Sequence, residues 1–423
     1  PISDEARDVH RWSTPTPHAD PRSDALTRQT PPWLARVFLV SHLVFFAILG
    51  TLARLGVQWI VWYPGTPVVL PVLWANFAGS LVMGFLVEDR MLFMSRADRR
   101  RLRGTENLRA RLFQRSKTRK QQDGDQQMTS AKTQRKTIPL YVGLTTGFCG
   151  CFTSFSAFAR DSFLALSNDL PTPIVHPQTT ASTVNRKIGY SFQAWLNVVI
   201  LTLALSLGAF AAGSHIAIFL DPVTPRIHSR RIARRIVDPA MVGLAIICWL
   251  AAVFLSIWPP DHPSGPSSPG TWANETWPRE ALFALALAPP GCLLRFYASV
   301  NFNRLVASFP LGTFASNMLG TAVLAMCWDL QHVGVGTTGR VGGGYIGCQI
   351  LQGVMDGWCG GLTTVSSWAA EIYGLRRAHG WVYAAASIVG ATSLTVIIMG
   401  SVRWTIGWQP TVCATGYPSK LSG

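Results

Sequence analysis

Residues 147–156 read Gly-Phe-Cys-Gly-Cys-Phe-Thr-Ser-Phe-Ser, and residues 357–366 read Gly-Trp-Cys-Gly-Gly-Leu-Thr-Thr-Val-Ser. Glycines and hydroxyl residues stand at the same places in both stretches, inside long apolar segments where polar groups are costly. Similarity of this kind within one chain indicates a repeated structural unit. We therefore expect a diverged internal duplication, whose fold depends on how the two copies meet.

Two shorter motifs precede each stretch, in the same order in both copies. In one motif a glycine precedes an arginine by four residues, and in the other an asparagine precedes a glycine by three. The matched pairs are Gly50-Thr51-Leu52-Ala53-Arg54 with Gly291-Cys292-Leu293-Leu294-Arg295, and Asn76-Phe77-Ala78-Gly79 with Asn317-Met318-Leu319-Gly320. Each copy thus keeps an arginine and an asparagine within apolar sequence.

The composition places both copies in a membrane. Hydrophobic residues make up 48% of the chain and charged residues 14%, with 16 Trp, whereas an average soluble domain has about 25% charged residues. Apolar stretches near the ~20 residues that a spanning helix needs lie at 37–62, 68–88, 138–166, 191–220, 238–258, 279–298, 309–330, 345–369 and 381–402. The sequence predicts an all-α polytopic membrane protein with about nine helices, four in each copy and one between them.

The net charge of +16 is concentrated in connecting segments. Lys and Arg dominate residues 96–136 and recur at 226–235, as the positive-inside rule predicts for cytoplasmic loops that can also touch anionic lipid. This distribution argues against nucleic-acid binding. The eight Cys lie almost wholly in hydrophobic stretches, so their spacing predicts neither a disulfide framework nor a zinc site.

The topology follows from the two basic segments. If both are cytoplasmic, the N-terminus is cytoplasmic, the helix at 238–258 crosses alone, and the second copy starts from the opposite side as an inverted repeat. The segment 259–278, with a glycosylation sequon at Asn274, then lies outside, as does the C-terminus. The predicted organisation is a disordered cytoplasmic tail at 1–35, a first unit at 36–220 with a basic cytoplasmic insertion at 96–136, a basic loop and linker helix at 221–258, an extracellular Pro/Ser/Gly-rich loop at 259–278, a second, inverted unit at 279–402 and a tail at 403–423.

The third apolar segment of each copy is interrupted by Gly, Thr and Ser, which indicates a helix broken near the bilayer midplane. Two breaks that meet at an inverted interface present carbonyl oxygens to a cation and half-helix N-termini to an anion. The alternative is that the small residues only allow close helix packing.

The matched polar residues favour an anion as ligand. Arg54, Arg295, Asn76 and Asn317 supply guanidinium and amide donors, whereas a proton-coupled cation exporter needs a carboxylate within the membrane. The arginines can instead be structural and bind main-chain carbonyls, and the asparagines can make interhelical hydrogen bonds. Phe155 and Phe158 lie on one helical face, where they either offer electropositive ring edges to an anion or pack in the core.

With these motifs in order twice and a helix between the copies, the chain resembles the Fluc fluoride channels, and its doubled form is similar to the two-domain fluoride exporters of eukaryotes. The family pattern is Gly-x-x-x-Arg, then Asn-x-x-Gly, then a glycine-rich Thr-Thr-Phe-Ser-Thr-Phe run. The match covers about 36–220 and 279–402. The resemblance implies passive, selective fluoride permeation through narrow pores at an antiparallel interface, with a structural sodium ion at the centre.

The resemblance also implies roles for particular residues. Main-chain carbonyls of four residues would hold the sodium, and the side chains of nine would line the pores or bind the anion. The sodium ligands are Gly150, Thr153, Gly360 and Thr363, and the anion-binding residues are Asn76, Asn317, Phe155, Phe158, Ser156, Ser366, Trp368, Arg54 and Arg295.

The second copy departs from the family pattern. Val365 and Trp368 stand where the family has phenylalanine, and Ala157 replaces a threonine in the first copy. Family pores take one phenylalanine from each unit, so one path would combine Phe155 with Trp368 and the other Val365 with Phe158. Valine has no ring edge, which predicts unequal paths with poor conduction past Val365.

We therefore expect a passive fluoride-selective export channel of the plasma membrane, not an enzyme, working as a monomer of two pseudo-symmetric halves in the lipid bilayer. The alternative is a secondary transporter of another small solute, with Asp356, which matches Thr146, as the only candidate coupling carboxylate. A third hypothesis is a non-transporting membrane scaffold whose basic insertion recruits partners.

Overall fold

The computed structural model describes residues 31–61, 70–89, 137–170, 187–221, 233–259, 279–336 and 339–413, with residues 68, 92, 93, 135, 223 and 224 beside them. The tail up to residue 30, most of the basic insertion at 96–136, residues 225–232 and the Asn274 sequon lie outside the described residues. The predicted cytoplasmic or extracellular placement of those segments stays a prediction.

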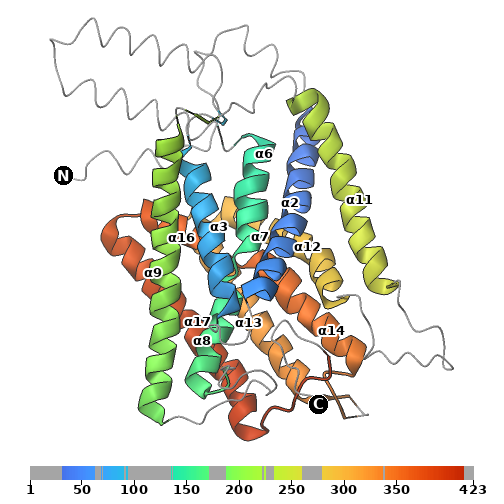
Figure 1. Cartoon of the computed structure of the whole chain (residues 1–423), viewed down its shortest axis with the longest axis vertical. Helices are drawn as coiled ribbons and strands as arrows, with labels where there is room; N and C mark the ends of the chain where they lie inside the picture. The colour runs from blue at the N-terminus through green and yellow to red at the C-terminus, as the bar shows by residue number, and fades with distance from the viewer. Residues whose placement is uncertain are drawn as a thin grey trace, which may run out of the picture.

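The first unit consists of four membrane segments, the third of which is broken (Figure 1). These are α2 (Pro32–Val61), α3 (Pro71–Glu88), the series α6 (Pro139–Val142), η3 (Gly143–Cys149), α7 (Gly150–Phe152) and α8 (Phe155–Ser167), and α9 (Ile188–Leu220). A proline in the first turn starts α3 and α6, where its missing N–H costs no helical hydrogen bond. Because α2 begins at Pro32, helix replaces the last residues of the tail predicted at 1–35.

The linker and the second unit follow in the same order. η4 (Ala233–Val237) continues into α11 (Asp238–Ile257), which packs against α2 and α12. The second unit consists of α12 (Arg279–Phe302), α13 (Leu311–His332), a short antiparallel hairpin of β1 (Gly334–Val335) and β2 (Arg340–Val341), the series α14 (Tyr345–Gly353), η6 (Val354–Cys359), α15 (Gly360–Leu362) and α16 (Ser366–Gly374), and α17 (Arg377–Thr405).

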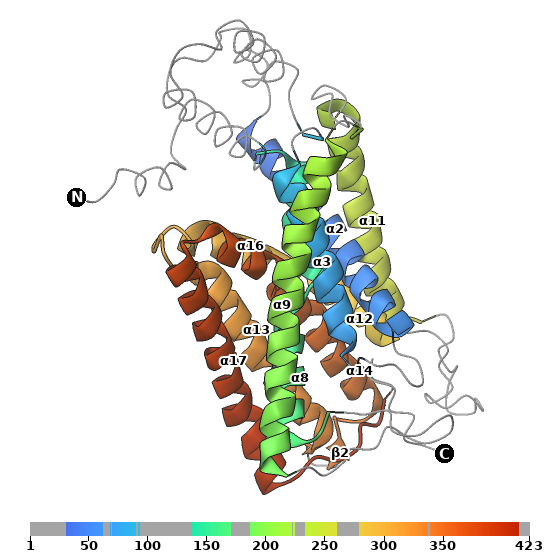
Figure 2. The same ribbon diagram turned by 60° about the vertical axis from the view of Figure 1, so that its left-hand side comes forward.

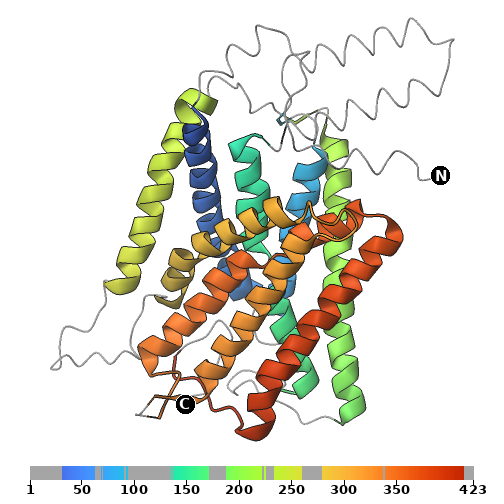
Figure 3. The same cartoon turned by 180° about the vertical axis from the view of Figure 1, so that it is seen from behind.

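The two units run in opposite directions. Figure 1 shows α2, the segment from α6 to α8 and α11 running down from the upper end, whereas α12 and α14 start at the lower end and run up. Figure 3 shows the same relation from behind, where α17 descends and α9 ascends. The predicted all-α fold of an inverted, duplicated four-helix unit with a single linker helix is therefore confirmed.

Eight helices of the described chain are long and apolar enough to cross a membrane. The ninth predicted span, 345–369, is present as the series from α14 to α16, but it falls outside that group of eight. Its Gly, Gln, Thr and Ser residues are sheltered by other helices, and a segment that faces protein rather than lipid does not need high hydropathy. Burial differs in the same way elsewhere, since the Pro139–Ser167 window is 83% buried and that of the linker helix only 22%.

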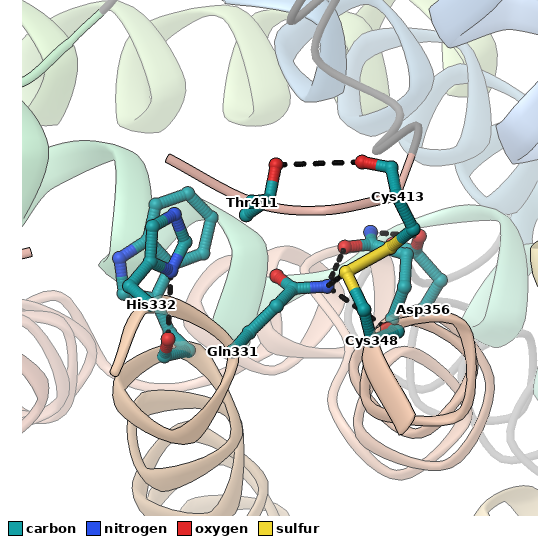
Figure 4. Close-up of a disulfide and its surroundings, with 8 residues drawn as sticks. Gln331, His332, Cys348, Asp356, Thr411 and Cys413 are labelled. Carbon is teal, nitrogen blue, oxygen red and sulfur yellow. Dashed lines mark hydrogen bonds between the residues drawn. A yellow bond between two sulfur atoms is a disulfide. The ribbon is translucent and has the colours of Figure 1, made fainter. Parts of the chain in front are cut away.

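The cysteine prediction was wrong in one respect. Cys348 in α14 and Cys413 beyond α17 form a disulfide, although 65 residues separate them (Figure 4). The chain after α17 turns back to the C-terminal end of α13, where the amide of Gln409 donates to the carbonyl of His332 at 2.9 Å. Since this return is a tertiary feature, the spacing of the cysteines could not reveal the pair. The other six cysteines are free thiols.

Candidate functional site

The predicted helix breaks are present at matched residues of the two units. Thr153 ends α7 with φ −97° and ψ 151°, and Thr363 ends α15 with φ −95° and ψ 154°. Both are extended rather than helical, so each third segment stops and restarts in the middle of the bundle. α7 and α15 contact one another there.

An asparagine from the second helix holds each break open. Asn76 Oδ1 accepts from the amide of Ser154 at 2.9 Å, and Asn317 Oδ1 accepts from the amide of Thr364 at 2.9 Å. The amide nitrogens donate back to the carbonyls of the same two residues, at 3.4 and 3.3 Å. Both asparagines are fully buried. Each asparagine side chain therefore bonds both main-chain groups of Ser154 or Thr364, which the break removes from the helical hydrogen-bond pattern. The role of the two asparagines as pore residues stays a prediction.

The threonine at each break caps the restarting helix of the other unit. Thr153 Oγ1 accepts from the amides of Val365 and Ser366, both at 3.1 Å, at the start of α16. Thr363 Oγ1 accepts from the amide of Ser156 at 3.1 Å, at the start of α8. The Ser366 hydroxyl also donates across the interface to the carbonyl of Cys149 at 3.0 Å. Two helix N-termini, whose dipoles favour negative charge, thus meet at the centre and are held by crossed hydroxyl groups.

The glycines of the repeated motifs permit these close approaches. A Cβ at Gly79 or at Gly320 would overlap the methyl group of Thr153 or of Thr363, respectively. In the first helices, a Cβ at Gly50 or at Gly291 would overlap a main-chain carbonyl of the π-helical part of the neighbouring third segment. The motif glycines are therefore packing requirements of the site.

The arginines of the first helices reach across the interface. Arg54 Nη2 donates to the main-chain carbonyl of Asp356, and Arg295 Nη2 donates to that of the matched Thr146 at 2.8 Å. Arg295 Nε also donates to the carbonyl of Gly361 at 3.0 Å. Only 1% of Arg54 and 2% of Arg295 are exposed. The geometry matches the structural alternative, in which the guanidinium groups tie the two units together through carbonyls, and anion binding by these groups stays a prediction.

The four predicted sodium ligands have carbonyls released from helical hydrogen bonding. In a continuous helix the Gly150 and Gly360 carbonyls would accept from the amides of Ser154 and Thr364, but those amides donate to the two asparagines. The helical partners of the Thr153 and Thr363 carbonyls likewise donate to the hydroxyls that begin α8 and α16. Four freed carbonyls at two touching breaks suit a hard cation, which prefers oxygen ligands. The guanidinium groups beside Gly150 and Gly360 act against a cation.

The aromatic residues form one cluster across the units. The rings of Phe155 and Trp368 lie edge to face with centroids 5.4 Å apart, and Phe155 meets Phe158 at the same distance. Val365 belongs to the same buried core. The structure thus brings together the predicted pair of Phe155 and Trp368, and its conduction role stays a prediction.

Helix contacts define two equivalent sides of the bundle. On the first side, α16 of the second unit packs against α3 and α9 (Figure 2); on the second side, α8 of the first unit packs against α13 and α17. Several fully buried hydroxyls on these helices have no hydrogen-bond partner among the described residues: Ser80 and Ser206 on the first side, and Ser162, Ser316 and Thr321 on the second. The sequence reasoning missed them, although Ser80 and Thr321 follow the glycine of the Asn-x-x-Gly motif in both copies.

Asp356 is not the only embedded carboxylate, which corrects the sequence prediction. Asp161 is buried in α8 and pairs with Arg160 at 3.0 Å. Glu371 in α16 accepts from Thr313 at 2.6 Å and from Tyr383 at 2.8 Å. The Asp356 carboxylate accepts from Gln352 at 2.6 Å. Each carboxylate is therefore held by donors from the protein.

Comparisons with known proteins agree with this architecture. A family model described as CrcB-like protein, Camphor Resistance (CrcB), matches residues 41–214 and 282–402. "Fluoride export protein 1" of Neurospora crassa is 48% identical over 385 residues, which cover 89% of this chain and 69% of that protein. "Fluoride export protein 1" of Candida albicans is 29% identical over 371 residues, covering 87% of this chain and 81% of that protein.

A bacterial relative matches a single unit. The "Fluoride-specific ion channel FluC" of Pseudomonas aeruginosa is 30% identical over 135 residues, which cover 98% of that protein but only 30% of this chain. This ratio fits a duplicated unit. No solved structure shows a significant match. Because the family model covers both units and the matched motifs form the central contacts, the chain belongs to the CrcB-like family.

Proposed function

We propose that this protein is a passive, fluoride-selective export channel that lowers cytoplasmic fluoride. The carrying observation is the pair of crossed helix breaks, at which Thr153 and Thr363 hold two half-helix N-termini together in a buried interface. The names of the relatives, fluoride export protein and fluoride-specific ion channel, support fluoride as the ion. As a channel, the protein is not an enzyme.

Donors without a fixed charge suit a small anion that must leave its water. Buried hydroxyls without partners, such as Ser80 and Ser206, can replace hydration by hydrogen bonds along the helices of one side. The edges of the rings of Phe155 and Phe158 are electropositive and add weaker contacts. Neutral donors bind fluoride without the deep electrostatic trap of a free guanidinium, and conduction requires that binding be weak enough for the ion to leave.

Passive export needs no coupling machinery. HF crosses lipid as a neutral acid and ionises at cytosolic pH, and the membrane potential then drives the trapped anion outward. The alternative, a coupled transporter, would need one of the three embedded carboxylates Asp161, Asp356 and Glu371, of which only Asp161 is fully buried. Their engagement with Arg160, Gln352 and Thr313 favours structural roles instead.

A structural sodium ion at the centre is part of the proposal. The freed carbonyls of Gly150, Thr153, Gly360 and Thr363 support it, because oxygen ligands at two touching breaks can join the units through one cation. Exchanging sodium for a large organic cation should then lower the thermal stability of the purified protein. Equal stability in the two salts would reject the ion.

The proposed location is the plasma membrane, with the N-terminus cytoplasmic and the C-terminus extracellular. The disulfide of Cys348 with Cys413 supports the outer placement of that end, because disulfides persist in oxidising compartments. The starts of α2 and α11 lie at the opposite end of the bundle (Figure 1), and α11 follows in the sequence the basic segment 226–235, which the positive-inside rule predicts to be cytoplasmic. One shared core across both units supports a monomer of two halves.

Flux from liposomes tests the proposal. Purified protein should release fluoride without a proton or sodium gradient and should release chloride far more slowly. Phe155→Ile should reduce the fluoride flux, and Phe254→Ile, which changes a side chain that is 58% exposed on the linker helix, should not. Equal chloride flux, or fluoride flux that requires a cation gradient and stops in Asp356→Asn, would reject the channel in favour of a transporter.

A further inference from the structure

Trp368 carries a buried hydrogen-bond donor that the protein leaves unused. Its side chain is 1% exposed, and its indole Nε1 has no hydrogen-bond partner among the described residues. Two other indoles of the described chain are satisfied, since Trp408 donates to Asp329 at 3.0 Å and Trp249 donates to the carbonyl of Ala286 at 2.9 Å. The buried Nε1 of Trp195 in α9, on the same side of the bundle as Trp368, shares the lack of a hydrogen-bond partner. A buried donor without a partner costs about 1–3 kcal/mol, so the donor of Trp368 calls for an explanation.

The donor lies where the proposed path crosses from one unit to the other. α16, which carries Trp368, packs against α3 and α9 of the first unit. The Trp368 ring meets Phe155 edge to face, with an interplanar angle of 71°. Ser80 on α3 and Ser206 on α9 are also fully buried and have hydroxyls without partners in the described chain. Three helices that pack together thus each contribute an unpaired donor.

The chemistry of the indole group restricts its partner. An indole N–H donates one hydrogen bond and accepts none, so neither a cation nor another donor can satisfy it. An N–H is a stronger donor than a ring edge, and a hydrogen bond to a charged acceptor contributes about 1.5–3 kcal/mol. The matched residue of the first unit, Phe158, has no such group.

We propose that the indole N–H of Trp368 donates a hydrogen bond directly to the permeating fluoride ion beside Phe155. This inference rests on the proposed channel function and adds a binding group to one of the two paths. The site takes a small anion that accepts short hydrogen bonds, and it lies on the α3, α9 and α16 side. The opposite path has Val365 and Phe158 at the corresponding positions and therefore lacks an equivalent donor.

The test compares Trp368→Phe, which keeps an aromatic ring and removes the N–H, with Trp404→Phe at a position that is 61% exposed. Fluoride flux from liposomes is measured over a range of fluoride concentrations. We expect the half-saturating concentration to rise roughly 10- to 100-fold in Trp368→Phe, the factor that corresponds to one hydrogen bond to a charged group. Trp404→Phe should match the wild type.

A direct measurement covers the case in which the variant misfolds. In wild-type protein with ¹⁵N-labelled indoles, the Nε1–H resonance that is missing in Trp368→Phe should move downfield as fluoride is added, and it should not respond to chloride. An unchanged half-saturation in a folded variant, or a resonance insensitive to fluoride, would overturn this inference alone. Absence of any fluoride flux in the wild type would instead overturn the proposed function.

Discussion

The hydroxyl of Thr153 is expected to be the strongest contact between the two units that involves no charged side chain. Its oxygen accepts from the amides of Val365 and Ser366, both in the other unit and both at 3.1 Å. Thr153→Val keeps the shape of the side chain and removes that acceptor. Two buried amides then lose a partner, at about 1–3 kcal/mol each. Two such losses would total about 2–6 kcal/mol. Because interhelical hydrogen bonds in membranes average only about 0.6 kcal/mol, we expect the lower part of this range, a fall in the free energy of unfolding of about 2–4 kcal/mol.

Two further threonines calibrate this expectation. Thr363→Val removes the acceptor of one amide, that of Ser156, and should cost about half as much. Thr395 is equally buried, but its hydroxyl donates only to carbonyls of its own helix, at 3.1 and 3.0 Å. Thr395→Val should therefore cost less than about 1 kcal/mol. Unfolding titrations with a denaturing detergent in mixed micelles measure all three variants. If Thr153→Val were no more destabilising than Thr395→Val, crossed capping would not hold the units together.

Three other changes test separate features of the structure. Gly150→Ala should lower the free energy of unfolding by about 1–3 kcal/mol, because the new Cβ would overlap the Arg295 guanidinium. Gly208→Ala is the control, since nothing lies within 4 Å of that position. Equal stability of the two variants would contradict the contact between Gly150 and Arg295. Val365→Phe should raise fluoride flux in a Phe155→Ile background by adding a ring edge to the second path, and no gain would mean that the ring edge is not what that path lacks. In intact cells, a membrane-impermeant maleimide should label Cys413 only after reduction, and labelling that requires permeabilised cells would place this end of the protein inside.

Passive export also constrains how the site can be regulated. A channel that binds its anion through neutral donors and ring edges needs no titrating coupling group at its centre. Two carboxylates on the restarting helices α8 and α16 each have donors: Arg160 for the buried Asp161, and Thr313 and Tyr383 for the half-buried Glu371. The Glu371 hydrogen bonds join α16 to α13 and α17, whereas the Arg160–Asp161 pair lies within α8.

Much of the architecture could be predicted from the sequence because the decisive signals are local. The length of the apolar stretches predicts the helices, the basic segments predict the topology, and the glycine and hydroxyl residues around Thr153 and Thr363 predict the breaks. Each signal depends on the cost of placing a polar group in lipid. This cost affects the composition of a short segment directly, so it can be read from a few neighbouring residues. The repeated Asn-x-x-Gly and Gly-x-x-x-Arg motifs indicated the central contacts for the same reason.

Only the tertiary structure decided which residues meet. It shows that Thr153 caps the helix that begins beside Val365, that Arg54 binds a carbonyl of the opposite unit, and that Cys348 pairs with Cys413. These partners are far apart in the chain, so no spacing or periodicity encodes them. The unused N–H of Trp368 belongs to the same class, because a donor is unsatisfied only with respect to everything packed around it. The sequence alone determined where helices form and break, and the packing of one unit against its inverted copy determined which residues meet at the centre.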